Sequence, residues 1–127
     1  MSLSKIRLEL ARTKETPEGD PRCGYEFVAP LDDAGHFDLA AWRQHKALCT
    51  VRRFWLHADD ERGLLVHTRG NKWVFSYAPG EDDDEPLFKF DRHTFQAGEY
   101  VSVTEHDGVT RPFRIVAISG LRTAASA

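Results

Sequence analysis

The fold of this chain is decided by residues 100–118, which read YVSVTEHDGVTRPFRIVAI. Two stretches rich in β-branched and aromatic residues flank the dipeptide Asp107-Gly108. Such a dipeptide between alternating apolar residues is the strongest short-range signal of a β-hairpin. The stretch therefore predicts an antiparallel, β-rich protein.

The two strands of this hairpin can pair in two registers. A two-residue turn pairs Val101 with Arg114. A three-residue loop with Gly108 at positive φ pairs Val101 with Phe113. The second register places more apolar side chains on one face, and we prefer it because the buried face of a strand sets its register.

The rest of the chain alternates short β-prone runs with turn-rich segments. Further strands are predicted over residues 6–12, 25–29, 49–57, 64–68, 72–77 and 87–90, and polar loops over 13–24, 59–63 and 79–85. Asp38 is the predicted N-cap of one short helix over 39–46, because its side chain can accept hydrogen bonds from the free amides of the first turn. About seven closely spaced strands predict a mainly β fold, either a small antiparallel barrel or a two-sheet sandwich.

The tryptophans fall on the apolar phases of these elements. Trp55 and Trp73 are predicted to lie in the core, and Trp42 is predicted to pack from the helix onto the sheet. Aromatic residues in strands usually pack against neighbours in this way.

The bulk composition indicates a single domain over residues 1–127, with a flexible C-terminal tail over 120–127. The chain is 41% hydrophobic and 29% charged, which is ordinary for a globular protein. No apolar run reaches the length of a membrane span, and Met1–Lys5 does not begin a signal peptide. We therefore expect a cytoplasmic protein in which Cys23 and Cys49 are free thiols.

Two blocks of sequence carry a resemblance to known proteins. They are CTVRRFW at 49–55 and GEYVSV at 98–103. Together they resemble short uncharacterised bacterial proteins with β-rich folds. The resemblance covers most of the chain and implies no activity and no catalytic residue.

Four residues offer the donor atoms of a structural zinc site, namely Cys23, His36, His45 and Cys49. The paired spacings typical of zinc sites are absent, and the predicted helix ends between His45 and Cys49. The alternative is two buried thiols and two surface imidazoles. We predict neither a metal nor a cofactor.

A catalytic pair of histidine and carboxylate is conceivable at His93 and Glu99, which flank one loop. His106 also has acidic neighbours, but a solvated side chain is expected in a hairpin turn. The nucleophile elbow, the phosphate-binding loop and the H-E-x-x-H motif are all absent from the sequence. A small enzyme is therefore the second interpretation of this chain.

The adjacent arginines Arg52 and Arg53 must point to opposite faces of their strand. The one on the core side needs a carboxylate partner, and the other is expected to be free to meet something acidic. Arginine beside Trp55 would also suit single-stranded nucleic acid. The formal net charge of −3 argues against nucleic acid, so this is the third interpretation.

A run of five acidic residues is the last candidate surface. It comprises Glu81, Asp82, Asp83, Asp84 and Glu85. The run either forms a solvated connection or contributes an electrostatic contact. Our first interpretation is a non-catalytic binding module for a protein or peptide, with a surface formed by Arg52, Arg53, Trp55, His93 and the acidic run.

Overall fold

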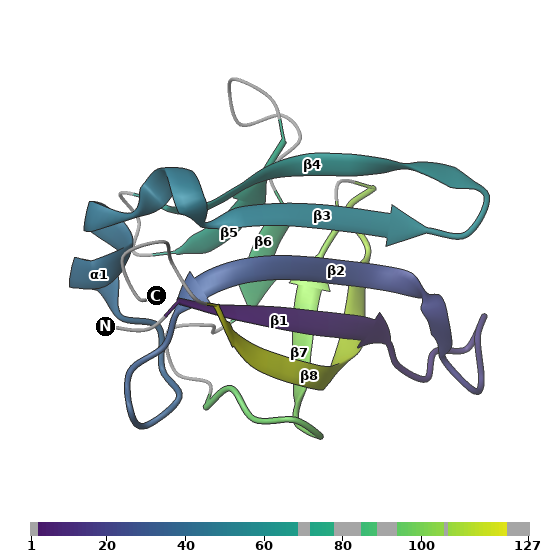
Figure 1. Cartoon of the computed structure of the whole chain (residues 1–127). Helices are drawn as coiled ribbons and strands as arrows, with labels where there is room; N and C mark the ends of the chain where they lie inside the picture. Colours follow the sequence, from purple (N-terminus) through teal and green to yellow (C-terminus); the bar gives the residue numbers. More distant parts are fainter. Residues whose placement is uncertain (1–2, 69–71, 78–84, 89–93, 106, 122–127) are drawn as a thin grey trace.

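The computed structural model describes residues 3–68, 72–77, 85–88, 94–105 and 107–121. The strands within these residues are β1 (Leu3–Leu10), β2 (Asp20–Pro30), β3 (Thr50–Trp55), β4 (Ala58–His67), β5 (Trp73–Ser76), β6 (Glu85–Phe88), β7 (Tyr100–Thr104) and β8 (Thr110–Leu121). Each strand pairs antiparallel with the next, and β1 also pairs with β8, so the sheet closes into a barrel (Figure 1). Of the two predicted β architectures, the barrel is the one found.

The helical segment covers one end of the barrel. It consists of α1 (Leu39–Gln44) and the 3-10 helix η1 (Lys46–Leu48), between β2 and β3. Asp38 caps α1 as predicted, because its side chain accepts a hydrogen bond of 3.1 Å from the Ala41 amide. No helix in the described part of the chain is long and apolar enough to cross a membrane.

Trp42 fixes the helix to the barrel. Its indole Nε1 donates to the Leu65 carbonyl over 2.9 Å, and its ring meets the edge of Trp73 at a centroid distance of 5.4 Å. Trp73 is buried, as predicted, and Trp42 packs from the helix onto the sheet, as predicted. The barrel end near α1 is therefore closed by aromatic packing.

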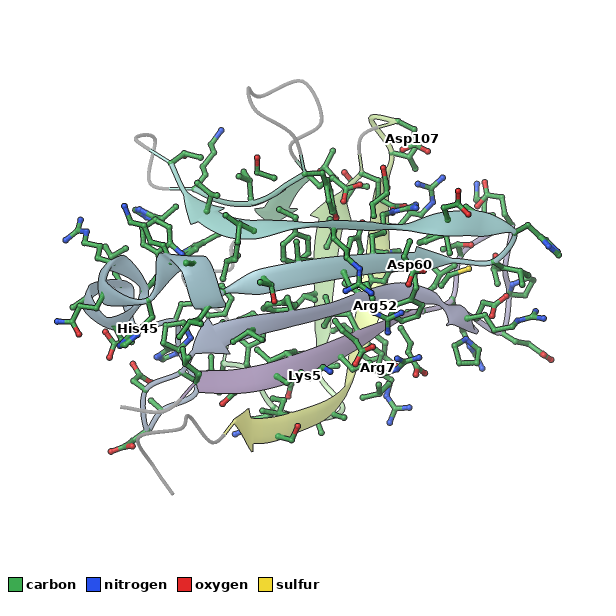
Figure 2. The ribbon with its side chains drawn as sticks, turned by 45° about the horizontal axis from the view of Figure 1, so that its top comes forward. Lys5, Arg7, His45, Arg52, Asp60 and Asp107 are labelled. Carbon is green, nitrogen blue, oxygen red and sulfur yellow. The ribbon has the colours of Figure 1, made fainter. Side chains whose placement is uncertain are left out.

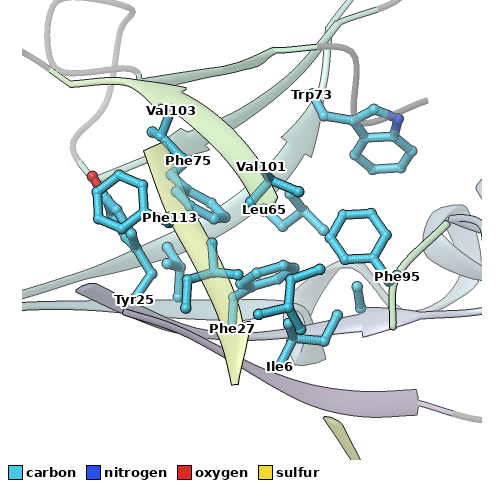
Figure 3. Packing of buried hydrophobic residues seen from close by; sticks show 14 of the residues in the cluster. Ile6, Tyr25, Phe27, Leu65, Trp73, Phe75, Phe95, Val101, Val103 and Phe113 are labelled. Atoms are coloured by element: carbon cyan, nitrogen blue, oxygen red, sulfur yellow. The ribbon is translucent and has the colours of Figure 1, made fainter. Parts of the chain in front are cut away.

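Aromatic side chains fill the interior of the barrel (Figure 3). The rings of Phe27 and Phe75 lie 5.1 Å apart, and Tyr25 meets Phe113 edge-on at 5.1 Å. The strands alternate accordingly: in β1 the side chain of Ile6 is buried, whereas Lys5 lies outside. Functional side chains must then come from the outer face or from the barrel ends.

The final hairpin adopts the preferred register. Val101 pairs with Phe113, and Gly108 has a φ of 83°. The Gly108 amide donates to the Glu105 carbonyl over 2.8 Å, which closes the turn. Both predictions are confirmed.

The predicted polar reversal at 59–63 is wrong. These residues belong to β4, and the chain reverses earlier, next to His57, which has a φ of 65°. The charged residues of β4 can form a strand because β3 supplies ion-pair partners. Glu61 of β4, for example, pairs with Arg53 on the neighbouring strand. The sequence of a single strand does not reveal such ion pairs, because the partner residue belongs to the neighbouring strand.

The boundaries of several other segments differ from the prediction, and α1 ends at Gln44 instead of residue 46. β2 begins at Asp20, inside the predicted loop, and Glu85 starts β6 instead of ending a loop. The predicted flexible tail begins at residue 120, but Gly120 and Leu121 still belong to β8. The rest of the predicted tail, 122–127, lies outside the described residues.

Replacing Gly108 by alanine should destabilise the fold by about 1 kcal/mol. An added Cβ would meet no atom within 4 Å, so the cost comes from the positive φ alone. Urea unfolding should show the loss, and Gly120→Ala is the matched control because that site is equally open but lacks a positive φ. Equal effects of the two changes would contradict the left-handed turn.

Candidate functional site

Strand β3 separates two clusters of charge. Arg52 points outward and Arg53 points into the barrel, as the alternation of a strand requires. We call the outer cluster the charged groove and the inner cluster the polar network. The polar network lies at the barrel end away from α1, because Arg53 stands near the C-terminal end of β3.

The polar network is centred on Glu105, whose side chain is 1% exposed. Arg53 donates to its Oε2 from Nε over 3.0 Å and from Nη2 over 2.8 Å. The Tyr25 hydroxyl donates to the same oxygen over 2.8 Å, and Arg111 donates to Oε1 over 2.6 Å. The prediction that the inward arginine has a carboxylate partner is confirmed.

A second buried carboxylate, Glu85, extends the network. Its Oε1 accepts from the Tyr77 hydroxyl over 2.5 Å and lies 3.0 Å from the Tyr25 hydroxyl, whose single proton is shared with the closer Glu105. Burial, with Glu85 close by, raises the pKa of both tyrosines far above the ordinary value. Both hydroxyls therefore remain protonated and act as donors at neutral pH.

Trp55 borders the same network. Its ring lies 4.2 Å from the Arg53 guanidinium and meets Phe113 edge-on at 6.3 Å. Trp55 is only partly buried, so the prediction of a core position holds in part. The polar groups of the network form hydrogen bonds with one another. We infer that these bonds hold the strands together at this end of the barrel.

The charged groove lies on the outer face of β1 to β4. Residues directly opposite one another across these strands form a row consisting of Arg7, Glu26, Arg52 and Arg62. Figure 2 shows Lys5, Arg7, Arg52 and Asp60 on this face. One acid thus stands among three arginines.

Glu26 holds the groove together. It accepts a very short contact from Arg52, and it pairs with Arg7 at 3.3 Å and with Lys5 at 3.5 Å. Burial alone would raise the pKa of Glu26, but these three cations lower it below the ordinary value. The carboxylate is therefore charged at neutral pH.

Phe54 supports the arginines from below. The guanidinium groups of Arg7 and Arg52 lie 4.4 Å and 5.0 Å from the centre of its ring. Cation–π contacts of this kind favour guanidinium groups that lie flat on the ring. Phe54 is consequently buried although it points away from the barrel interior.

Arg62 is the open cation of the groove, meaning that it lacks the carboxylate partner which Lys5, Arg7 and Arg52 have among the described residues. It stands directly opposite Arg52, is exposed, and has no ion pair with any residue that the structure describes. Arg52 is engaged by Glu26 and by Asp60 at 2.9 Å, so the prediction that Arg52 is free was wrong. Like charges directly opposite one another repel, and an anion between Arg52 and Arg62 would relieve that repulsion.

A hollow of about 340 Å³ accompanies these charges. It is lined by Lys5, Glu26, Phe27, Val28, Thr50, Val51, Arg52, Arg62 and Gly63. The lining carries three cations against one acid, so the hollow is locally positive on a chain with a net charge of −3. Such a hollow can bind an anionic group.

The predicted metal donors do not converge. Cys49 precedes β3, whereas Cys23 lies beside its other end, next to the Gly24–Phe54 pair. Both are free and buried, and burial raises the pKa of Cys49 to about 11, which disfavours the thiolate that a metal requires. Among the residues with described positions, no His, Cys, Asp and Glu side chains form a metal-binding group.

The other predicted donors and bases are scattered. His45 is the C-cap of α1, and His36 contacts Thr94 at 3.3 Å. Glu99 is exposed just before β7. His93 and the residues Glu81, Asp82, Asp83 and Asp84 lie outside the described residues, and Glu85 is buried rather than on the surface.

Sequence reasoning missed most members of both clusters. The sequence places Glu105 only beside the hairpin turn, and it predicts a loop position for Arg62. The alternation of charged and apolar residues from Lys5 to Glu9 is the signal in the sequence that could have placed Lys5 and Arg7 on one face.

Replacing Glu105 by glutamine should destabilise the protein by about 3–5 kcal/mol, because it leaves the buried Arg53 without its main counter-charge. Denaturant unfolding measures the loss. Glu61→Gln is the control, since Glu61 also pairs with Arg53, at 3.7 Å, but its side chain is 40% exposed. Its effect should stay below about 1 kcal/mol, and equal losses would contradict the central place of Glu105.

Stability should also fall steeply in alkali. Tyrosines whose pKa is raised by folding stabilise the protein fully below the unfolded value near 10 and lose that contribution as pH rises further. Above about pH 11, Tyr77→Phe should make the free energy of unfolding fall less steeply, by about 1.4 kcal/mol per pH unit. Tyr100→Phe, at an exposed ring, is the control and should leave the slope unchanged.

Comparison with known proteins adds no function to this geometry. No protein-family model, curated protein or solved structure matches the chain. The resemblance to short bacterial proteins therefore stays a prediction. The activity has to be inferred from the charged groove and the polar network themselves.

Proposed function

We propose that this protein is a non-catalytic binding module that recognises an acidic segment of a protein partner in the charged groove. The single observation that carries the proposal is the open cation Arg62, held directly opposite Arg52. An acidic side chain placed there gains a direct ion pair with Arg62, and the guanidinium of Arg52, although engaged by Glu26 and Asp60, adds positive charge beside it.

The groove is organised before any partner arrives. Arg52 is held by Glu26, Asp60 and the ring of Phe54. An arginine that is already fixed loses little conformational freedom on binding, so more of the interaction energy appears as affinity. This favours recognition over a merely solvated surface.

A protein partner fits the groove better than a nucleic acid. Bases need open aromatic faces for stacking, but Phe54 is buried beneath two guanidinium groups. The acids Glu26 and Asp60 lie within the same patch and would repel a continuous phosphate backbone. A peptide can place single carboxylates between such acids.

The polar network supports a binding module rather than an enzyme. Glu85 and Glu105 are buried, and both already accept hydrogen bonds from tyrosine or arginine. A general base must reach its substrate, and these carboxylates are engaged inside the barrel. We further propose a cytoplasmic location for this module.

A labelled peptide of alternating glutamate and serine tests this function by fluorescence anisotropy at physiological salt. Arg62→Glu should weaken its binding at least about tenfold, or about 1.4 kcal/mol, because it replaces attraction by repulsion. Arg43→Glu, the same charge change on the exposed side of α1, is the matched control and should have little effect.

Two results would overturn the proposal. One is equal binding by the Arg62 and Arg43 variants. The other is sub-micromolar affinity for a single-stranded oligonucleotide, with a steep salt dependence that Arg62→Glu abolishes, since this is the behaviour of a phosphate-binding surface.

A further inference from the structure

The charged groove has an apolar side. Leu64 and Leu48 are two of the few large hydrophobic side chains that stand exposed, at 40% and 51%. Leu64 is two residues from Arg62 on β4 and lies opposite Thr50. Leu48 belongs to η1, which packs beside β4.

The floor between the charged and apolar sides is made of small side chains. Val28 and Thr50 line the hollow, with Lys5 opposite Val28 and Leu64 opposite Thr50. The larger side chains of Arg52 and Arg62 stand one row further along the strands. The hollow therefore has a low, partly apolar floor beside a wall of positive charge.

The size of the hollow limits what can occupy it. Its volume of about 340 Å³ is at the lower end of small-molecule pockets, which run from roughly 300 to 1,000 Å³. It suits one or two side chains of a longer chain better than a whole cofactor. An occupant with one acidic and one apolar group would match both sides.

The spacing on β4 matches an extended peptide. Arg62 and Leu64 both point outward and are two residues apart, which in a strand is about 6.8 Å. Side chains at alternate positions of an extended peptide point the same way with nearly the same spacing. Such a segment can place a carboxylate at Arg62 and an apolar side chain at Leu64 together.

We propose that the groove reads an extended protein segment in which an acidic residue and an apolar residue stand two positions apart. The carboxylate lies between Arg52 and Arg62, and the apolar side chain rests on Leu64 over the floor of Val28 and Thr50. This inference rests on the proposed function, because it specifies the acidic segment that the groove recognises.

Three peptides of equal length test the spacing by fluorescence anisotropy. One repeats Glu-Ser-Leu-Ser, so that glutamate and leucine share a face when extended. The second repeats Glu-Leu-Ser-Ser, which has the same composition but places them on opposite faces. The third is the alternating glutamate–serine peptide. The first should bind about tenfold more tightly than the second, which corresponds to burying roughly 60 Å² of apolar surface.

Variants assign that preference to the groove. Leu64→Ser should reduce it to less than about twofold, since the apolar contact is lost. Val109→Ser, at a valine that is 46% exposed on the β7–β8 hairpin, is the matched control and should leave the preference unchanged. Both residues are exposed, so neither change threatens the fold, and a thermal melt verifies this.

The outcomes separate the two proposals. If the two leucine peptides bind equally while binding still depends on Arg62, the spacing inference is overturned and the proposed function stands. If a preference exists but Leu64→Ser leaves it intact, the inference is likewise overturned. If no acidic peptide binds at all, the proposed function fails and the inference fails with it.

Discussion

The ion pair between Arg53 and Glu105 is the interaction on which the rest of the structure depends. A buried guanidinium is tolerated only where a carboxylate and further hydrogen bonds compensate its lost hydration. Burial opposes the charge of Arg53, yet Glu105 raises the pKa of Arg53 above the ordinary value. The same carboxylate binds Tyr25 and Arg111, so one group ties together strands that are remote in the sequence.

This inner contact also determines the outer face. A slip of β3 by one residue would exchange its two faces, bringing Arg52 into the barrel and Arg53 to the surface. The slip is disfavoured because it would separate Arg53 from the buried carboxylate of Glu105. Arg52 is thereby held outward, opposite Glu26 and Arg62. The arrangement of the charged groove is therefore a consequence of the ion pair between Arg53 and Glu105 inside the barrel.

The local features of the fold could be predicted from the sequence, whereas its long-range polar contacts could not. The register of the final hairpin and the cap at Asp38 follow from residues close in sequence, and both are confirmed. Glu105 is 80 residues from Tyr25, and its burial depends on closure of the barrel. Glu85 ends an acidic run, which predicts a solvated loop, whereas the tyrosine hydroxyls and Arg53, whose Nε lies 3.9 Å from Glu85 Oε2, compensate its burial.

A small barrel of this size has no interior space for a ligand, so the proposed binding site has to lie on its outside. The eight strands found in the described residues enclose an interior just wide enough for side chains, and aromatic rings occupy it here. The hollow of the charged groove lies on the outer surface, and Gly63 contributes to its lining. A Cβ at Gly63 would lie 2.1 Å from the Ser76 carbonyl, so β4 can approach β5 this closely only without a side chain there. Gly63 lies between Arg62 and Leu64, so this close approach links the outward side chains of both residues to the closure of the barrel.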